Sequence, residues 1–160
     1  MKKQLILGLM LAASISAFAA DQTPAEELVA RSGLPLSDIQ EMLAKCDSDD
    51  QTTVGRMFCG WRDLIVAEYD LQEIVDQRNS LRPEHKAALD ARIARWKKAR
   101  DVACKKIAHS DWGGGSEEPG AAMVCRAMET QDIVKAMKKD HTVVPCKNLV
   151  HICRHDAISR

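Results

Sequence analysis

Aromatic residues are scarce in this sequence, and neither sign of charge is in excess. Phe, Trp and Tyr make up 4% of the 160 residues, and 23 Lys and Arg stand against 23 Asp and Glu. The core must therefore be largely aliphatic. Proteins that bind nucleic acid through its phosphates need a basic surface. The charge balance therefore argues against a nucleic-acid partner.

Patterns typical of catalysis are also missing. The triple glycine at 113–115 is not followed by the Lys and Ser or Thr of a phosphate-binding loop. A glycosidase needs two carboxylates at a set separation in a cleft, and a small helical bundle offers little room for one. We therefore expect no enzymatic activity and no cofactor.

One long apolar run is present, at the start of the chain. Lys2 and Lys3 precede apolar residues 5–13, and an Ala-x-Ala pattern ends at Ala19. This order is typical of a secretory signal peptide, and the run is too short to span a bilayer. We expect cleavage near Ala19, which leaves 21 basic residues once Lys2 and Lys3 are removed from the 23, against 23 acidic ones. The mature protein should be periplasmic or secreted, with no membrane attachment.

Six cysteines follow the expected cleavage site. An even number of cysteines in a small exported domain favours three disulfides. Six cysteines allow fifteen pairings, so spacing alone does not choose among them. In the tail, the spacings Cys146-x6-Cys153 and His151-x3-His155 do not form a standard tetrahedral zinc set. We therefore expect no metal there and favour a disulfide between Cys146 and Cys153.

The remaining sequence has helical periodicity, and no segment shows the alternation of a strand. Thr23, Pro24 and an acidic first turn begin a short helix that Gly33 ends. A break at Pro83 separates two long helices, which should therefore lie antiparallel. The fold class is thus all-α: a small helical bundle of one long antiparallel hairpin and a third long helix, cross-linked by disulfides. The helices should cover about residues 24–32, 36–45, 52–79, 84–108 and 119–139, with a loop at 111–118.

Apolar residues at intervals of three and four define the buried face of each long helix. Glu68 and Arg100 occupy interior positions on two of these faces. A buried charge without a partner costs several kcal/mol. With the centre of the hairpin near residue 81, Asp63 lies at the height of Arg100, and Glu68 and Asp101 are the other candidate partners. The expected core residues are Val54, Met57, Trp61, Leu64, Leu71, Val75, Leu89, Ile93, Trp96, Ala103, Ile107, Met123, Ala127, Thr130, Val134 and Met137.

Several spaced residues carry a resemblance to a known family. One group spans the last two long helices and their connection: Trp96-x3-Arg100-Asp101-x2-Cys104, Gly114-Gly115-Ser116 and Cys125-x4-Thr130. A second group lies upstream: Cys59-x7-Ala67-Glu68-x2-Leu71-Gln72. Over about residues 46–137 this pattern resembles the N-terminal domain of the LprI-type lysozyme inhibitors. Glu68 and Gln72 replace the Asp and Asn of that family, Val75 replaces a Tyr, and Ile133 replaces an Arg.

The resemblance implies an exported helical domain that binds lysozyme and blocks peptidoglycan hydrolysis. Its partner would be a basic peptidoglycan hydrolase. Two alternatives remain: an immunity protein against a wall-degrading toxin, and an envelope interaction protein without a hydrolase partner. We expect a signal peptide at 1–19, short helices at 20–45, an LprI-like domain at 46–139 and a disulfide-pinned tail at 140–160.

The helical arrangement favours two further disulfides, Cys46–Cys59 and Cys104–Cys125. The geometric rivals are Cys59–Cys104 and Cys46–Cys125. A Cys104–Cys125 bond would fasten the glycine loop to both of its helices. That loop should lie at an acidic end of the bundle, opposite a basic end that contains Arg78, Arg82, Lys86, Lys135, Lys138 and Lys139.

Two interpretations of the acidic end remain open: ordinary solvated helix ends, or a docking surface for a basic partner. Trp112 is the candidate anchor, because Trp is favoured at binding hot spots. Its alternative role is to pack over the Cys104–Cys125 bond. The candidate binding residues are Asp47, Asp49, Asp50, Asp111, Trp112, Ser116, Glu117 and Glu118.

Overall fold

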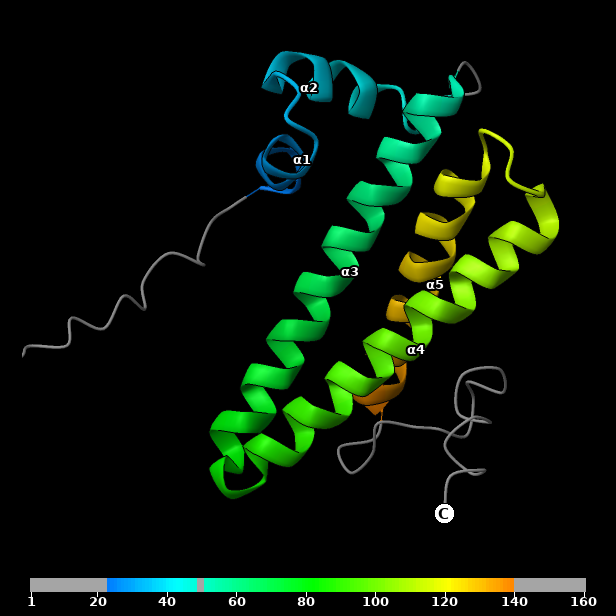
Figure 1. Ribbon diagram of the computed structural model, residues 1–160. Helices are drawn as coiled ribbons and strands as arrows, with labels where there is room; N and C mark the ends of the chain where they lie inside the picture. Colours follow the sequence, from blue (N-terminus) through cyan, green and yellow to red (C-terminus); the bar gives the residue numbers. More distant parts are fainter. Residues whose placement is uncertain (1–22, 49–50, 140–160) are drawn as a thin grey trace, which may run out of the picture.

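The computed structural model describes residues 23–48 and 51–139 (Figure 1). Within these ranges the chain is helical and has no strand, which confirms the all-α fold class. The expected signal peptide, Asp49, Asp50 and the expected Cys146–Cys153 bond lie outside the described residues. The helices are α1 (Pro24–Ser32), α2 (Leu36–Ala44), α3 (Thr53–Leu81), η1 (Pro83–His85, a 3-10 turn), α4 (Lys86–Trp112) and α5 (Glu118–Lys139).

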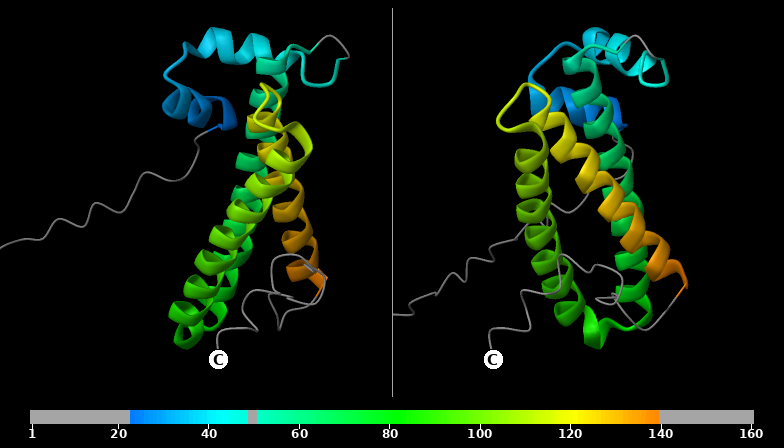
Figure 2. Two further views of the ribbon diagram at one scale, coloured as in Figure 1. Left: turned by 45° about the vertical axis from the view of Figure 1, so that its right-hand side comes forward. Right: turned by 90° about the vertical axis from the view of Figure 1, so that its right-hand side faces the viewer.

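Helices α3 and α4 form the expected hairpin, but α5 supplies most of the packing. The two helices meet at η1 and diverge toward their other ends, and α5 runs along both (Figure 2). α3 packs far more extensively on α5 than on α4. The core between the three helices is aliphatic apart from one Trp. It contains Leu71, Ile74, Val75, Ile93, Trp96, Ile133, Val134 and Met137.

α3 also buries a second face, which the periodicity did not separate from the first. Phe58 and Ile65 pack against Leu28 of α1 and Ile39 of α2. Phe58 meets Trp61 edge to face, with 5.7 Å between ring centroids. The pair α1–α2 therefore covers the upper part of α3 on the side away from the three-helix core (Figure 1).

Two expected core residues are instead exposed. Val54 lies in the first turn of α3, and Ile107 lies near the end of α4. The buried face of α4 continues from Arg100 through Cys104 and Ala108, in steps of four residues. Because each step of four residues advances by about 40° around the helix, the buried face near the end of α4 turns toward Ala108 and leaves Ile107 at its edge.

Capping residues set both ends of α1 and the end of α4. Thr23 and Glu26 form a reciprocal capping box at the start of α1, and Gly33 ends that helix with a φ of 72°. α4 runs four residues further than expected, to Trp112, where Gly113 ends it with a φ of 58°. The connection between α4 and α5 is therefore residues 113–117, not the longer loop expected from 111.

Small residues allow α3 and α5 to approach closely. A Cβ atom built on Gly60 of α3 would lie 3.1 Å from Cγ2 of Val124 and 3.3 Å from its backbone nitrogen. On Gly120 of α5 a Cβ atom would have ordinary contacts, the nearest at 3.5 Å from Met57. The interface therefore requires a glycine at position 60 more strictly than at position 120.

Replacing Gly60 by Ala should destabilise the protein, because the new methyl group would lie so close to the side chain and backbone of Val124 that α5 must shift to admit it. Overpacking of this kind costs about 1–3 kcal/mol. Gly120→Ala is the matched control on the facing helix, and it should be neutral or slightly stabilising. Urea unfolding of both variants measures the difference. Equal stabilities would show that the interface accommodates a larger separation.

Candidate partner-binding site

The α4–α5 connection lies at the end of the bundle away from the hairpin tip (Figure 1). Gly113 and Gly114 both have positive φ, 58° and 84°, which residues with a side chain rarely adopt. The amide of Gly115 donates to the carbonyl oxygen of Trp112 at 2.9 Å. The chain thus reverses its direction within a few residues, and the glycines of the loop allow the backbone to do so.

Two carboxylates anchor this loop to its surroundings. Glu118 accepts a hydrogen bond from the amide of Gly114 at 2.7 Å and lies 3.0 Å from Nδ1 of His109. Glu117 reaches α3, where it accepts from the Thr53 hydroxyl at 2.7 Å and pairs with the Arg56 guanidinium. The loop is therefore fixed to both α3 and α4.

These contacts lower the pKa of both carboxyls. Hydrogen bonds from Arg56 and then Thr53 lower the pKa of Glu117 below its ordinary value. The hydrogen bond with His109 is the main cause of the lowered pKa of Glu118, and the Gly114 amide adds to it. Both groups are therefore ionised at neutral pH, and each has a cationic or potentially cationic neighbour.

The acidic end is consequently less acidic than the sequence suggested. Glu117 and Glu118 are engaged with Arg56 and His109 rather than turned wholly toward solvent. Asp47, Asp111 and Ser116 are exposed. Asp49 and Asp50 lie outside the described residues, so their place relative to the loop stays a prediction.

Trp112 lies at the last position of α4, directly before the loop. Its side chain is 51% exposed, so about half of this large apolar surface faces water. The other half is covered by the protein, so packing against the Cys104–Cys125 bond stays an alternative role for Trp112. An exposed aromatic side chain on a fixed loop is a suitable anchor for a protein partner.

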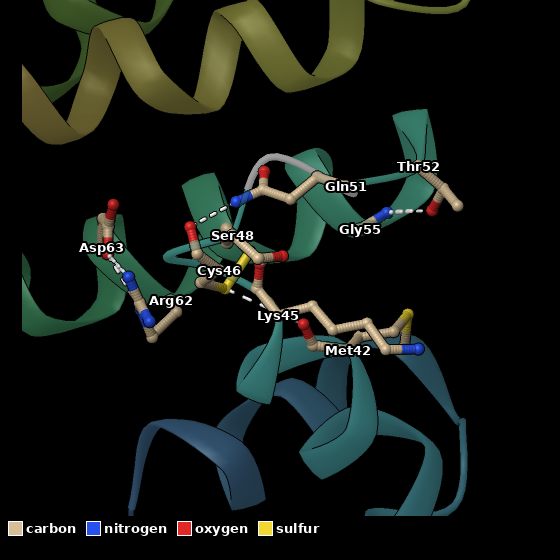
Figure 3. The surroundings of a disulfide bond; sticks show 10 residues. Met42, Lys45, Cys46, Ser48, Gln51, Thr52, Gly55, Arg62 and Asp63 are labelled. Carbon is tan, nitrogen blue, oxygen red and sulfur yellow. Dashed lines mark hydrogen bonds and ion pairs between the residues drawn. A yellow bond between two sulfur atoms is a disulfide. The ribbon is translucent and has the colours of Figure 1, made fainter.

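Two disulfides connect the helices near this end. Cys104 of α4 is bonded to Cys125 of α5, with Cα atoms 5.6 Å apart. Cys46, after α2, is bonded to Cys59 of α3. These are the two favoured pairings, and the geometric rivals are absent. Around Cys46 the chain is held further by the Gln51 side chain, which donates to the Cys46 carbonyl (Figure 3).

A buried arginine links the three long helices below the loop. Arg100 of α4 is 3% exposed. Its guanidinium pairs with Glu68 of α3 at 2.9 Å and with its neighbour Asp101 at 2.8 Å. It also donates to the Thr130 hydroxyl of α5 at 2.6 Å. Its Cζ lies 5.2 Å from the ring centroid of Trp96, a cation–π distance.

The expectation that Asp63 is the first partner of Arg100 was wrong. Asp63 pairs with its neighbour Arg62 at 2.8 Å. The expectation placed the centre of the hairpin near residue 81, but η1 at Pro83–His85 places it near residue 84. This shift brings Glu68, one of the other candidates, to the height of Arg100.

Thr130 was expected in the core but not as a partner of Arg100. Its hydroxyl accepts from Arg100 and donates to the Arg126 carbonyl at 2.7 Å. In the sequence, this role was indicated by the position of Thr130, a polar residue on the otherwise apolar face of α5. Arg126 also lies 3.5 Å from Asp101, so α4 and α5 share a second charged contact.

Within the described ranges, no cluster of three or more His, Cys, Asp or Glu residues is arranged to hold a metal ion. None of the helices there is both long enough and apolar enough to cross a bilayer.

Arg100→Leu should destabilise the protein by about 3 kcal/mol, because it leaves the partly buried Glu68 carboxylate without its ion-pair partner and removes one of the two hydrogen bonds of the Thr130 hydroxyl. Asp63→Asn is the control and should change the free energy of unfolding by less than about 0.5 kcal/mol. Combining Arg100→Leu with Glu68→Leu should recover part of the loss, because the stranded carboxylate is removed. Chemical denaturation checks all three. A cost for Asp63→Asn as large as for Arg100→Leu would contradict the observed pairing.

The stability that Glu117 contributes should disappear in acid. Its folded-state pKa lies below the ordinary value of 4.5, so the contribution is present above that value and is lost as the pH falls through the lowered pKa. The thermal midpoint of Glu117→Gln should therefore lie below that of the parent at neutral pH, and the two should converge once the pH has fallen through that lowered pKa. Glu73→Gln removes the same charge from the exposed face of α3 and serves as control. A gap for Glu117→Gln that persists in acid would show that the ion pair is not its cause.

A comparison of the sequence with models of known families identifies the family of this chain. The sequence model of the family described as "Lysozyme inhibitor LprI" matches residues 44–136, which is more than half of the chain. The matched range includes α3, α4, both disulfides, the Arg100 contacts and the glycine loop, and most of α5. Searches of the curated proteins and of the solved structures found no match. The chain belongs to the LprI lysozyme inhibitor family.

Proposed function

We propose that this protein is exported and inhibits lysozyme, or a related peptidoglycan hydrolase, by placing Trp112 and the 113–117 loop in the active-site cleft of that enzyme. Membership in an inhibitor family, rather than an enzyme family, is the starting point. The observation that carries the proposal is the half-exposed Trp112 at the head of a fixed loop.

Rigidity of the loop supports an inhibitory role. Binding is weakened by the entropy lost when loops and side chains become ordered. Here the Cys104–Cys125 bond, the Glu117 contacts with α3 and the Glu118 contacts with α4 hold the loop before a partner arrives. A preorganised loop retains more of its contact energy as affinity.

Shape and charge support the same partner. The 113–117 loop lies at one end of an elongated bundle (Figure 2), and Trp112 directly precedes it. Lysozymes are generally strongly basic, and Asp47 and Asp111 are exposed near this end. Such carboxylates would raise the rate of encounter with a basic partner more than the final affinity.

Export is part of the proposal. The N-terminal pattern of residues 1–19 predicts a signal peptide, and the substrate of lysozymes lies outside the cytoplasm. Disulfides persist in oxidising compartments and are rare in the cytosol. The Cys46–Cys59 and Cys104–Cys125 bonds are consistent with that location.

Trp112→Ala should weaken inhibition by about 30-fold or more, the loss expected for a hot-spot aromatic residue. Clearing of a cell-wall suspension by purified lysozymes, with and without the protein, gives the inhibition constant. Val102→Ala is the control, because Val102 is 65% exposed on α4 and its truncation should leave inhibition unchanged.

Two outcomes would count against the proposal. Absence of inhibition by the parent protein across lysozymes of different types, even at low salt, would reject the hydrolase partner. Inhibition unaffected by Trp112→Ala would reject the loop as the binding site while leaving the activity in place.

A further inference from the structure

The hairpin tip contains a groove, where α3 passes through η1 into α4 (Figure 1). Its volume is about 470 Å³, within the size range of ligand sites. Leu81, Ala88 and Leu89 supply its apolar wall. Leu81 is 74% exposed, more than any other large apolar residue in the described part of the chain. The groove therefore offers apolar surface that the described residues do not cover.

One polar group of the groove lacks a partner among the described residues. Asn79 is 8% exposed, and its side-chain amide donates to Asp90 at 2.9 Å. Its Oδ1 atom is buried and accepts no hydrogen bond from the described residues. Buried acceptors are nearly always satisfied, so this oxygen suits a donor such as the backbone N–H of a polypeptide segment that lies in the groove.

The last turn of α5 lies against this groove. Arg78, one of the lining residues, donates to the carbonyl oxygen of Met137 at 2.6 Å. α5 ends two residues later, at Lys139, toward the same end of the bundle as the hairpin tip (Figure 1). An extended chain advances about 3.3 Å per residue, so the residues that follow Lys139 can reach the groove within a few positions.

Residues 140–160 lie outside the described residues and beyond the range that the family model matches. A segment this short cannot form a core of its own. Its apolar side chains can therefore be buried only against the rest of the protein. The large apolar residues of the segment are Val143, Val144, Leu149, Val150, Ile152 and Ile158.

We propose that the C-terminal segment, residues 140–160, folds back on the hairpin tip and occupies this groove. Its apolar residues between Cys146 and Cys153 cover the apolar wall, and one of its backbone N–H groups donates to Oδ1 of Asn79. A bond between these two cysteines, expected from the sequence, would constrain the segment and reduce the entropy lost when it docks. Docking would tie the end of α5 to the hairpin, at the end of the bundle away from the 113–117 loop.

Covalent attachment favours this occupant over a second copy or a separate partner. A tethered segment competes for the groove at the high effective concentration that a short linker provides. The segment carries Asp140 and Asp156 against Lys147, Arg154 and Arg160, so its charge is nearly balanced and its docking relies on apolar contact. This occupant therefore requires no free cation among the arginines of the groove.

Cross-linking of the full chain tests the position of the segment. Lys147 lies between the two cysteines, and Lys86 is exposed directly after η1, beside the groove. A short amine-reactive reagent should join these two lysines. It should not join Lys147 to Lys106, which is exposed toward the other end of α4. Mixing isotope-labelled with unlabelled protein before the reaction distinguishes, by mass spectrometry, links within one chain from links between copies.

Trypsin cleavage after Lys147 measures how often the segment leaves the groove, because proteolysis tracks the population of the open form. Ala88→Glu should raise the cleavage rate by about fivefold or more, because docking would then bury the new carboxylate against apolar side chains. Ala94→Glu is the matched control, because Ala94 is exposed on the same helix and does not line the groove. It should leave the rate unchanged. Both alanines are exposed, so circular dichroism should show unchanged folds.

The proposal is overturned if the reagent does not join Lys86 to Lys147. It is also overturned if that link forms only between copies, which would make a second copy the occupant of the groove. A cleavage rate that Ala88→Glu leaves unchanged, or that Ala94→Glu raises as much, would reject the groove as the docking site. None of these outcomes depends on lysozyme inhibition.

Discussion

The position of each long helix depends on one buried cation. Arg100 extends from α4 and finds Glu68 on α3 and Thr130 on α5, so each helix of the core contributes to the same group. A buried ion pair is weak evidence of net stability, because desolvation offsets the attraction. Its effect here is geometric: a one-turn slip of α3 would separate Glu68 from the guanidinium, and a one-turn slip of α5 would separate Thr130 from it. Aliphatic side chains alone would tolerate such a slip more easily.

The Cys104–Cys125 bond and the close contact at Gly60 hold the helices together at other heights of the bundle. Gly60 lets α3 and α5 touch near the upper part of the bundle, and Cys104–Cys125 ties α4 to α5 beside the loop. Arg78 reaches the end of α5 at the hairpin tip. With α5 held at both ends and in the middle, the two residues that flank the 113–117 loop have fixed positions. The shape of the 113–117 turn is thus set by the whole bundle.

Local chemistry predicted most of the secondary structure. Thr23, Gly33 and Pro83 mark helix ends through capping, positive φ and steric exclusion, which act within a few residues of the chain. Contacts between helices were harder to predict. The choice of Glu68 over Asp63 depends on where η1 centres the hairpin, a difference of a few residues that periodicity does not encode. The pairing of Glu117 with Arg56 joins positions 61 residues apart, and no local pattern indicates it. Phe58 and Ile65 were not among the expected core residues, because the periodicity traced one face of α3 and their partners come from α1 and α2.

α3 carries two interfaces on one continuous helix: one face for α4 and α5, the other for α1 and α2. Each added or deleted residue in an α-helix turns everything beyond it by about 100°. A length change within Thr53–Leu81 would misalign both interfaces together, whereas a substitution affects one. Natural variants of this protein should therefore accumulate insertions and deletions in the connections between helices and retain the residue count of α3.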